Sequence, residues 1–120
     1  MTSQGSSWDI EVRNQGPVKI IKLRGRLSLG EPVDRVRATL EDALNAGNNC
    51  IVLDLSELAT VDSSGIGLLV MYLNNAKQRG GSLKLLNPSK FAVQTLKMIG
   101  LLNLFQVFQD QEEAVASFKD

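Results

Sequence analysis

The sequence has 120 residues, of which 43% are hydrophobic, and this suits one globular domain with an ordinary core. Thirteen basic and thirteen acidic residues cancel, so no general electrostatic attraction to nucleic acid or to an anionic membrane is expected. Histidine is absent, which removes the usual general base, the usual partner of a nucleophilic serine and the commonest transition-metal ligand. These features argue against a hydrolase or a metalloenzyme, and we expect neither enzyme activity nor a bound cofactor or metal.

The N-terminal segment and the longest apolar run bear on localisation. The longest nearly apolar run, residues 66–73, is far shorter than the roughly 20 residues that span a bilayer. Residues 1–7 lack the basic start and the apolar stretch of an export signal. We therefore expect a cytoplasmic protein that does not contact a membrane. Residues 1–7 are also small and polar, which predicts a flexible tail before a single domain over residues 8–120.

The domain is expected to begin with a β-hairpin. Ile10 and Val12 alternate with charged residues, which is the period-two pattern of a half-buried strand. Residues 14–17 supply a turn, and a second strand follows over about 18–23. Two strands joined by so short a turn pair antiparallel, which places the first strand at an edge of the sheet.

An amphipathic helix is predicted over about residues 31–46, after a connecting segment over 24–30. Pro32 lies near its start and Gly47 just past its end, as helix termini prefer. Its apolar stripe, at helical spacing, comprises Val33, Val36, Leu40 and Leu44.

A buried strand and a second helix flank the segment over residues 60–67. Residues 50–55 form a near-continuous apolar run rich in β-branched side chains, which is typical of a buried strand. Cys50, the single cysteine, begins this run and is interpreted as a small packing residue. The helix should run from about 63 to 77, before the stop signal at Gly80-Gly81. Its apolar face comprises Ile66, Leu69, Val70 and Leu73.

The C-terminal part continues the alternation of strands and helices. The predicted elements are a strand over 82–86, a helix that ends at Gly100, a strand over 104–108 and a helix over 111–118. In the first of these strands, leucines alternate with Ser82 and Lys84, and Ser89 can cap the helix that follows. The apolar faces are formed by Val93, Leu96 and Ile99 in the third helix and by Ala114, Val115 and Phe118 in the fourth.

The predicted order is ββαβαβαβα, and strands separated by helices of this length require parallel neighbours with right-handed crossovers. If successive strands lie side by side, the helices pack mainly on one face. The sequence therefore predicts an α/β domain with a mixed, mostly parallel sheet of about five strands. Functional sites in such sheets collect outside the carboxyl ends of strands, where residues 62–65 fall.

The turn between the buried strand and the second helix is the candidate site. Val61 and Ile66 have the spacing of a hydrophobic staple around Asp62, which makes Asp62 the expected N-cap. Ser63 and Ser64 are then the first two helical positions. Backbone N–H groups there lack intrahelical partners and the helix dipole favours an anion.

The residue types of this turn suggest three kinds of chemistry. A hydrolase elbow requires glycine two residues before the serine, where Val61 stands, and a histidine that the chain lacks. A phosphate-binding loop is weakly indicated by the glycines at 65 and 67. The favoured interpretation is structural: Gly65 permits close approach of the turn, and Gly67 permits close packing of the helix on the sheet. The third possibility is covalent phosphorylation of Ser63.

Residues 61–67, Val-Asp-Ser-Ser-Gly-Ile-Gly, resemble the signature of the STAS family, the anti-sigma-factor antagonists of bacteria. The resemblance extends from about Trp8 to Phe118 and includes the Gly25-Arg26-Leu27 segment and the Gly80-Gly81 stop. It implies the single-domain α/β fold described above and phosphorylation of Ser63. Ser28 stands where the family commonly has an acidic residue, in a loop that lies near the switch in that fold.

The resemblance implies a partner switch. The unmodified protein would bind an anti-sigma factor that is a serine kinase and so free the sigma factor, phosphorylation of Ser63 would end the complex, and a phosphatase would reset it. Asp62 would orient the turn, Ser64 would be a neighbouring polar group, and Gly65 would give the kinase access to the backbone. A monomer or weak homodimer is expected. The alternative is a non-phosphorylated STAS adaptor or small-ligand-binding module in a stress-signalling or transport assembly.

Overall fold

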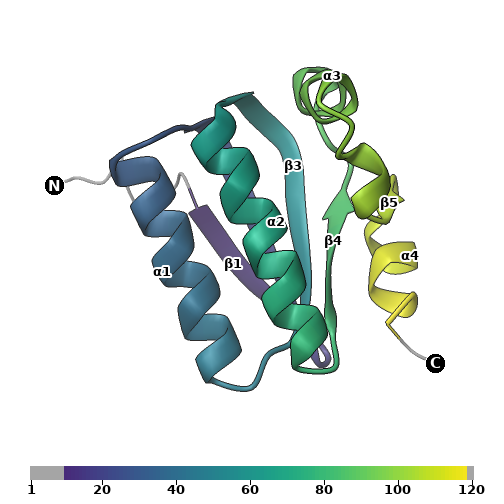
Figure 1. Ribbon diagram of the computed structural model, residues 1–120. Coiled ribbons are helices and arrows are strands. Elements are labelled where there is room, and N and C mark those ends of the chain that lie inside the picture. The colour runs from purple at the N-terminus through teal and green to yellow at the C-terminus, as the bar shows by residue number, and fades with distance from the viewer. Residues whose placement is uncertain (1–9, 119–120) are drawn as a thin grey trace, which may run out of the picture.

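The computed structural model describes residues 10–118 and is shown in Figure 1. The predicted tail over residues 1–7, and the start of the domain at residue 8, lie outside the described residues. The elements are β1 (Ile10–Gln15), β2 (Val18–Leu27), α1 (Glu31–Asn45), β3 (Cys50–Val61), α2 (Ser63–Gln78), β4 (Ser82–Leu86), α3 (Lys90–Met98), a 3₁₀ turn (Leu102–Leu104), β5 (Val107–Phe108) and α4 (Gln111–Ala116).

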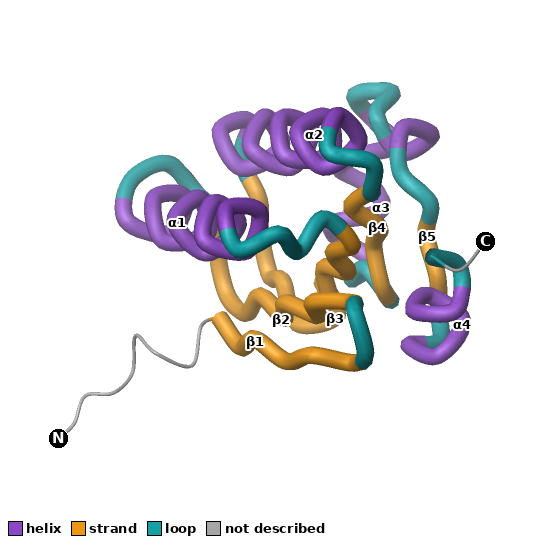
Figure 2. The backbone as a smooth tube through the Cα atoms, turned by 90° about the horizontal axis from the view of Figure 1, so that it is seen from below, coloured by secondary structure: helices purple, strands orange, loops and turns teal. Residues whose placement is uncertain are grey.

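The strands form one sheet in the order β1-β2-β3-β4-β5. Strand β1 pairs antiparallel with β2, and the other three pairs are parallel, which confirms the predicted mixed, mostly parallel sheet. Because each successive strand is added on the same side of the previous one, right-handed crossovers place α1 and α2 on the same face. Figure 2 shows these two helices side by side on one side of the sheet.

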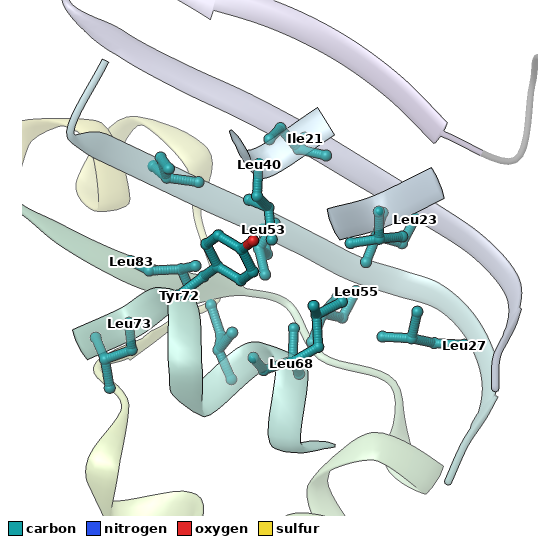
Figure 3. Packing of buried hydrophobic residues seen from close by; sticks show 14 of the residues in the cluster. Ile21, Leu23, Leu27, Leu40, Leu53, Leu55, Leu68, Tyr72, Leu73 and Leu83 are labelled. Atoms are coloured by element: carbon teal, nitrogen blue, oxygen red, sulfur yellow. The ribbon is translucent and has the colours of Figure 1, made fainter. Parts of the chain in front are cut away.

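The sheet has two unequal apolar faces. The larger core lies under α1, α2 and α3, and Figure 3 shows Tyr72 of α2 among leucines of the strands. Its fully buried side chains include Ile21, Leu40, Leu53, Leu55, Leu68, Leu69, Tyr72 and Leu83. The smaller core lies on the other face, where Ala114 of α4 packs with Val18, Ile20, Val52 and Leu86. Helices therefore pack mainly on one face, as predicted.

Two strands are longer than predicted. Strand β2 continues to Leu27, into the segment expected to be a connection, and β3 continues six residues beyond Leu55 to Val61. The two strands stay paired up to Leu27 and Val61, across register shifts on either side of Gly25. Gly25 has φ +81°, a conformation that glycine adopts without strain and that accommodates the bulge. Tertiary pairing has thus extended both strands to the edge of the candidate site.

The C-terminal elements are shorter than predicted. Strand β5 has only two residues, because Leu102–Leu104 forms a 3₁₀ turn that directs Phe105 into the larger core. Helix α3 ends at Met98 and buries Ala92 and Leu96, whereas Ile99 is 51% exposed. The predicted inward position of Ile99 is therefore wrong.

Candidate functional site

The candidate site is the turn between β3 and α2, and its backbone is fixed by the end of β2. Asp62 follows the last residue of β3 directly, and its backbone N–H donates to the carbonyl oxygen of Leu27 at 3.2 Å. Leu27 is paired with Val61 at the same point. Val61 and Ile66 are both buried in the larger core, at the positions predicted for a hydrophobic staple. The turn is therefore anchored on both sides of Asp62.

Asp62 is the N-cap of α2, as predicted, and it also holds a second loop. One carboxylate oxygen accepts a hydrogen bond from the backbone N–H of Gly65 at 3.0 Å, and the other accepts one from Leu29 at 3.0 Å. The backbone N–H groups of Leu29 and then of Gly65 hold the pKa of Asp62 below its usual range, because both bonds favour the ionised carboxylate. Asp62 is thus an ionised clamp between the β2–α1 loop and α2.

The two glycines of the turn differ in their packing. A Cβ atom on Gly65 would lie 2.7 Å from the carbonyl oxygen of Leu27 and 2.7 Å from the Val61 side chain, so Gly65 permits the close approach that the sequence predicted. Gly65 is buried, and its expected role in giving a kinase access to the backbone stays a prediction. A Cβ atom on Gly67 would meet nothing within 4 Å. The prediction that Gly67 packs closely on the sheet is therefore wrong.

Ser63 and Ser64 occupy the first two helical positions of α2, as predicted. Ser63 is exposed and Ser64 is half-buried. Within residues 10–118 the hydroxyl of Ser63 makes no hydrogen bond. Because the N-terminus of a helix favours negative charge, a phosphate on this hydroxyl is compatible with the fold. The ionised Asp62 lies next in sequence, so a modified turn would be strongly negative.

An exposed apolar groove adjoins Ser63. It has a volume of 640 Å³ and is lined by Ser63, Ile66, Gly67, Val70, Met71 and Asn74 of α2, together with Ile99 and Leu101. Met71, in its lining, is 44% exposed, and Met98, next in sequence to Ile99, is 83% exposed. The sequence gives no local signal for this groove, because Ile99 follows Leu96 by three residues and Ala92 by seven and so falls on the same helical stripe. Ile99 is exposed because α3 ends at Met98, before that stripe reaches it.

No group of three or more His, Cys, Asp or Glu residues in the described part of the chain is arranged to hold a metal ion. None of the helices between residues 10 and 118 is long and apolar enough to cross a bilayer.

Comparison with known families decides the class of the domain. Residues 9–114 match the family model of the STAS domain. The chain belongs to the STAS domain family. The match includes the whole turn between β3 and α2, so the recognition based on residues 61–67 is confirmed at the level of the family.

Individual relatives of this STAS domain are similar over nearly its whole length. The anti-sigma F factor antagonist of Paenibacillus polymyxa is 27% identical over 112 residues, which cover 92% of this chain and 94% of the relative. A crystal structure of a putative anti-sigma factor antagonist from Thermotoga maritima superposes with a TM-score of 0.84 at 23% identity, covering 92% of this chain and 95% of that one. The unphosphorylated form of the anti-sigma factor antagonist SpoIIAA superposes with a TM-score of 0.77 at 25% identity, over 90% of this chain and 94% of that one.

Proposed function

We propose that this STAS domain is an anti-sigma factor antagonist that works as a phosphorylation-controlled partner switch and has no enzyme activity of its own. Its unmodified form binds an anti-sigma factor that is a serine kinase, and phosphorylation of Ser63 ends the complex until a phosphatase resets it. The observation that carries the proposal is the hydroxyl of Ser63 at the first position of α2, which is exposed and makes no hydrogen bond to any residue from 10 to 118. Similar proteins named anti-sigma factor antagonists support the class of partner. SpoIIAA, which has the same fold, is known in unphosphorylated and phosphorylated forms.

The electrostatics of the turn support the way the switch would act. A phosphate adds about −1.5 to −2 charges beside a carboxylate that is already ionised. The helix dipole and first-turn N–H groups accommodate that charge within the folded chain. A partner surface matched to the single negative charge of Asp62 would instead face about three. The modification would therefore weaken docking without unfolding α2.

The groove beside Ser63 supplies the contact area that such a partner needs. Met71 and Ile99 are exposed large apolar residues on its two walls, one on α2 and the other after α3. Exposed apolar patches next to a polar switch are typical of protein interaction sites. We propose that the anti-sigma factor covers this groove and the turn together, so that a phosphate on Ser63 lies within the interface.

The test is phosphate transfer and partner capture in extract from the source organism. With ATP, the wild-type protein should gain one phosphate by intact mass, whereas Ser63→Ala should gain none and Ser64→Ala should behave as wild type. An unmodified bait should capture a kinase that a phosphorylated bait does not. An unchanged phosphate count in Ser63→Ala would refute the assignment of the acceptor.

The second candidate is a STAS adaptor or small-ligand-binding module that is not phosphorylated. The observation that favours it is a cavity of 240 Å³ between β2, β3 and the start of α1. Its walls include buried Leu23 and Leu58, and Leu27 links it to the turn at Gly65. This alternative gains if Ser63→Ala and Ser63→Asp both capture the same partners as the wild type.

A further inference from the structure

Strand β1 forms one edge of the sheet, and no other strand of residues 10–118 pairs with its outer side. It is the terminal strand in the order, paired only with β2 among the described residues. Residues 11–14 are exposed on both faces of the strand. Val12, at the middle of this stretch, is 47% exposed. An exposed edge strand with an apolar residue at its centre is a template for pairing with another strand.

The backbone groups that face outward can be identified from the register. Gln15 and Val18 close a two-residue hairpin loop as a hydrogen-bonded pair. Hydrogen-bonded and non-hydrogen-bonded pairs alternate along an antiparallel ladder, so Glu11 and Arg13 also bond to β2. The N–H and C=O groups of Ile10, Val12 and Asn14 therefore point away from the sheet. A second strand could bond to all three residues.

The sequence of this edge is complementary to itself. If two copies of β1 pair antiparallel about a two-fold axis through Val12, that residue lies opposite its own copy. Glu11 of each copy then lies opposite Arg13 of the other copy. These are non-hydrogen-bonded pairs on the outward ladder, in which side chains approach most closely. The symmetric pairing thus forms two cross-strand ion pairs and places no like charges opposite each other.

We propose that β1 binds a second copy of this chain, which joins the two sheets into one through antiparallel pairing centred on Val12. Glu11 and Arg13 fix the register of this pairing. Both charged side chains lie on the face opposite Val12, because successive side chains alternate along a strand. Glu11 accepts a hydrogen bond from Arg24 at 3.0 Å yet remains 46% exposed, so it can also accept one from the partner copy.

The expected dimer is weak and does not involve Ser63. One pair of six-residue strands buries less than the roughly 1,200 Å² of a standard interface, which corresponds to a transient, concentration-dependent dimer. Val12 also lines a groove of 310 Å³ with Ile21 and Ala43, so the second copy would partly cover apolar surface there. Ser63 lies at the start of α2 and is not part of β1, so the proposal is independent of phosphorylation.

Sedimentation velocity over a roughly hundredfold range of concentration tests the proposal. Wild type should shift from monomer to dimer as concentration rises. Arg13→Glu and Glu11→Arg each place like charges opposite one another twice per dimer and should raise the dissociation constant at least about tenfold. The double variant Glu11→Arg/Arg13→Glu restores opposite charges and should return within about threefold of wild type.

A matched control separates this register from a general charge effect. Arg37→Glu makes the same charge change as Arg13→Glu at an exposed position on α1, and should leave dimerisation unchanged. Val12→Lys, on the other face of β1, should abolish the dimer while circular dichroism shows an intact fold. A wild type that stays monomeric throughout, or a double variant no better than either single one, would overturn the proposal.

Discussion

Replacing Gly65 by alanine tests the closest packing in the candidate site. The new Cβ atom would lie 2.7 Å from the carbonyl oxygen of Leu27, 2.7 Å from Cγ2 of Val61 and 2.8 Å from Cγ of Leu27. The carbonyl oxygen belongs to the backbone of a paired strand, and it accepts the hydrogen bond from Asp62. It cannot move aside as the end of a flexible side chain could. The helix must therefore shift away from β2.

The magnitude follows from three contributions. Overpacking in a well-packed region costs about 1–3 kcal/mol. Loss of the hydrogen bond to Leu27 adds about 1 kcal/mol, while the better helix propensity of alanine returns about 1 kcal/mol. The last two contributions cancel, so we expect Gly65→Ala to lower the free energy of unfolding by about 1–3 kcal/mol. For a domain of this size the melting temperature should fall by roughly 4–12 °C.

The matched control is Gly67→Ala, in the same helical turn. An added Cβ atom there meets nothing within 4 Å, so only the propensity gain remains and stability should rise by about 0.5–1 kcal/mol. Urea unfolding followed by far-ultraviolet circular dichroism measures both variants. Equal stability of the two variants would refute the reasoning, because it would mean that the contact between Gly65 and Leu27 places no constraint on α2.

Three further predictions concern residues around the core. Backbone N–H groups, that of Leu29 foremost, lower the pKa of Asp62 in the folded state from its ordinary value of 3.8. The ionised carboxylate therefore stabilises the fold above pH 3.8, and this contribution is lost as the pH falls through the lowered pKa. Asp62→Asn should reduce the loss of stability at acid pH in a series of urea-unfolding measurements. Lys84→Met removes the ammonium that donates to the Ser117 hydroxyl at 2.8 Å, so amide exchange in α4 should accelerate about tenfold while exchange in α2 stays unchanged. Tyr72→Phe keeps the buried ring but loses the hydroxyl that donates to Glu41 of α1, which should cost about 1 kcal/mol, whereas Tyr72→Ala should cost about 3–5 kcal/mol in the same unfolding assay.

Local features of the chain were readable from the sequence. The N-cap role of Asp62, the staple formed by Val61 and Ile66, and the Ser89 cap of α3 all depend on residues at most five positions apart. The strand directions also followed, because short turns impose antiparallel pairing and helical crossovers impose parallel pairing. The side-by-side order of the strands was assumed, and the structure confirms it. The STAS signature belongs to this class, since residues 61–67 are contiguous. Sequence alone therefore determined the fold and the place of the candidate site.

Contacts between distant segments required the tertiary structure. Lys84 alternates with leucines and reads as exposed, yet it is 6% exposed because α4 and Phe118 cover it, and its ammonium lies 4.2 Å from the Phe118 ring centroid. The bond from Leu29 to Asp62 joins residues 33 positions apart, and no local spacing encodes it.

The surroundings of Ser63 depended on the tertiary structure in the same way. The extension of β2 to Leu27 gave Gly65 its close contact, and the early end of α3 placed Ile99 in the exposed groove. Local spacing positioned the serine on the first turn of α2, because capping is a short-range interaction. Pairing and packing over long range decided which surfaces surround it.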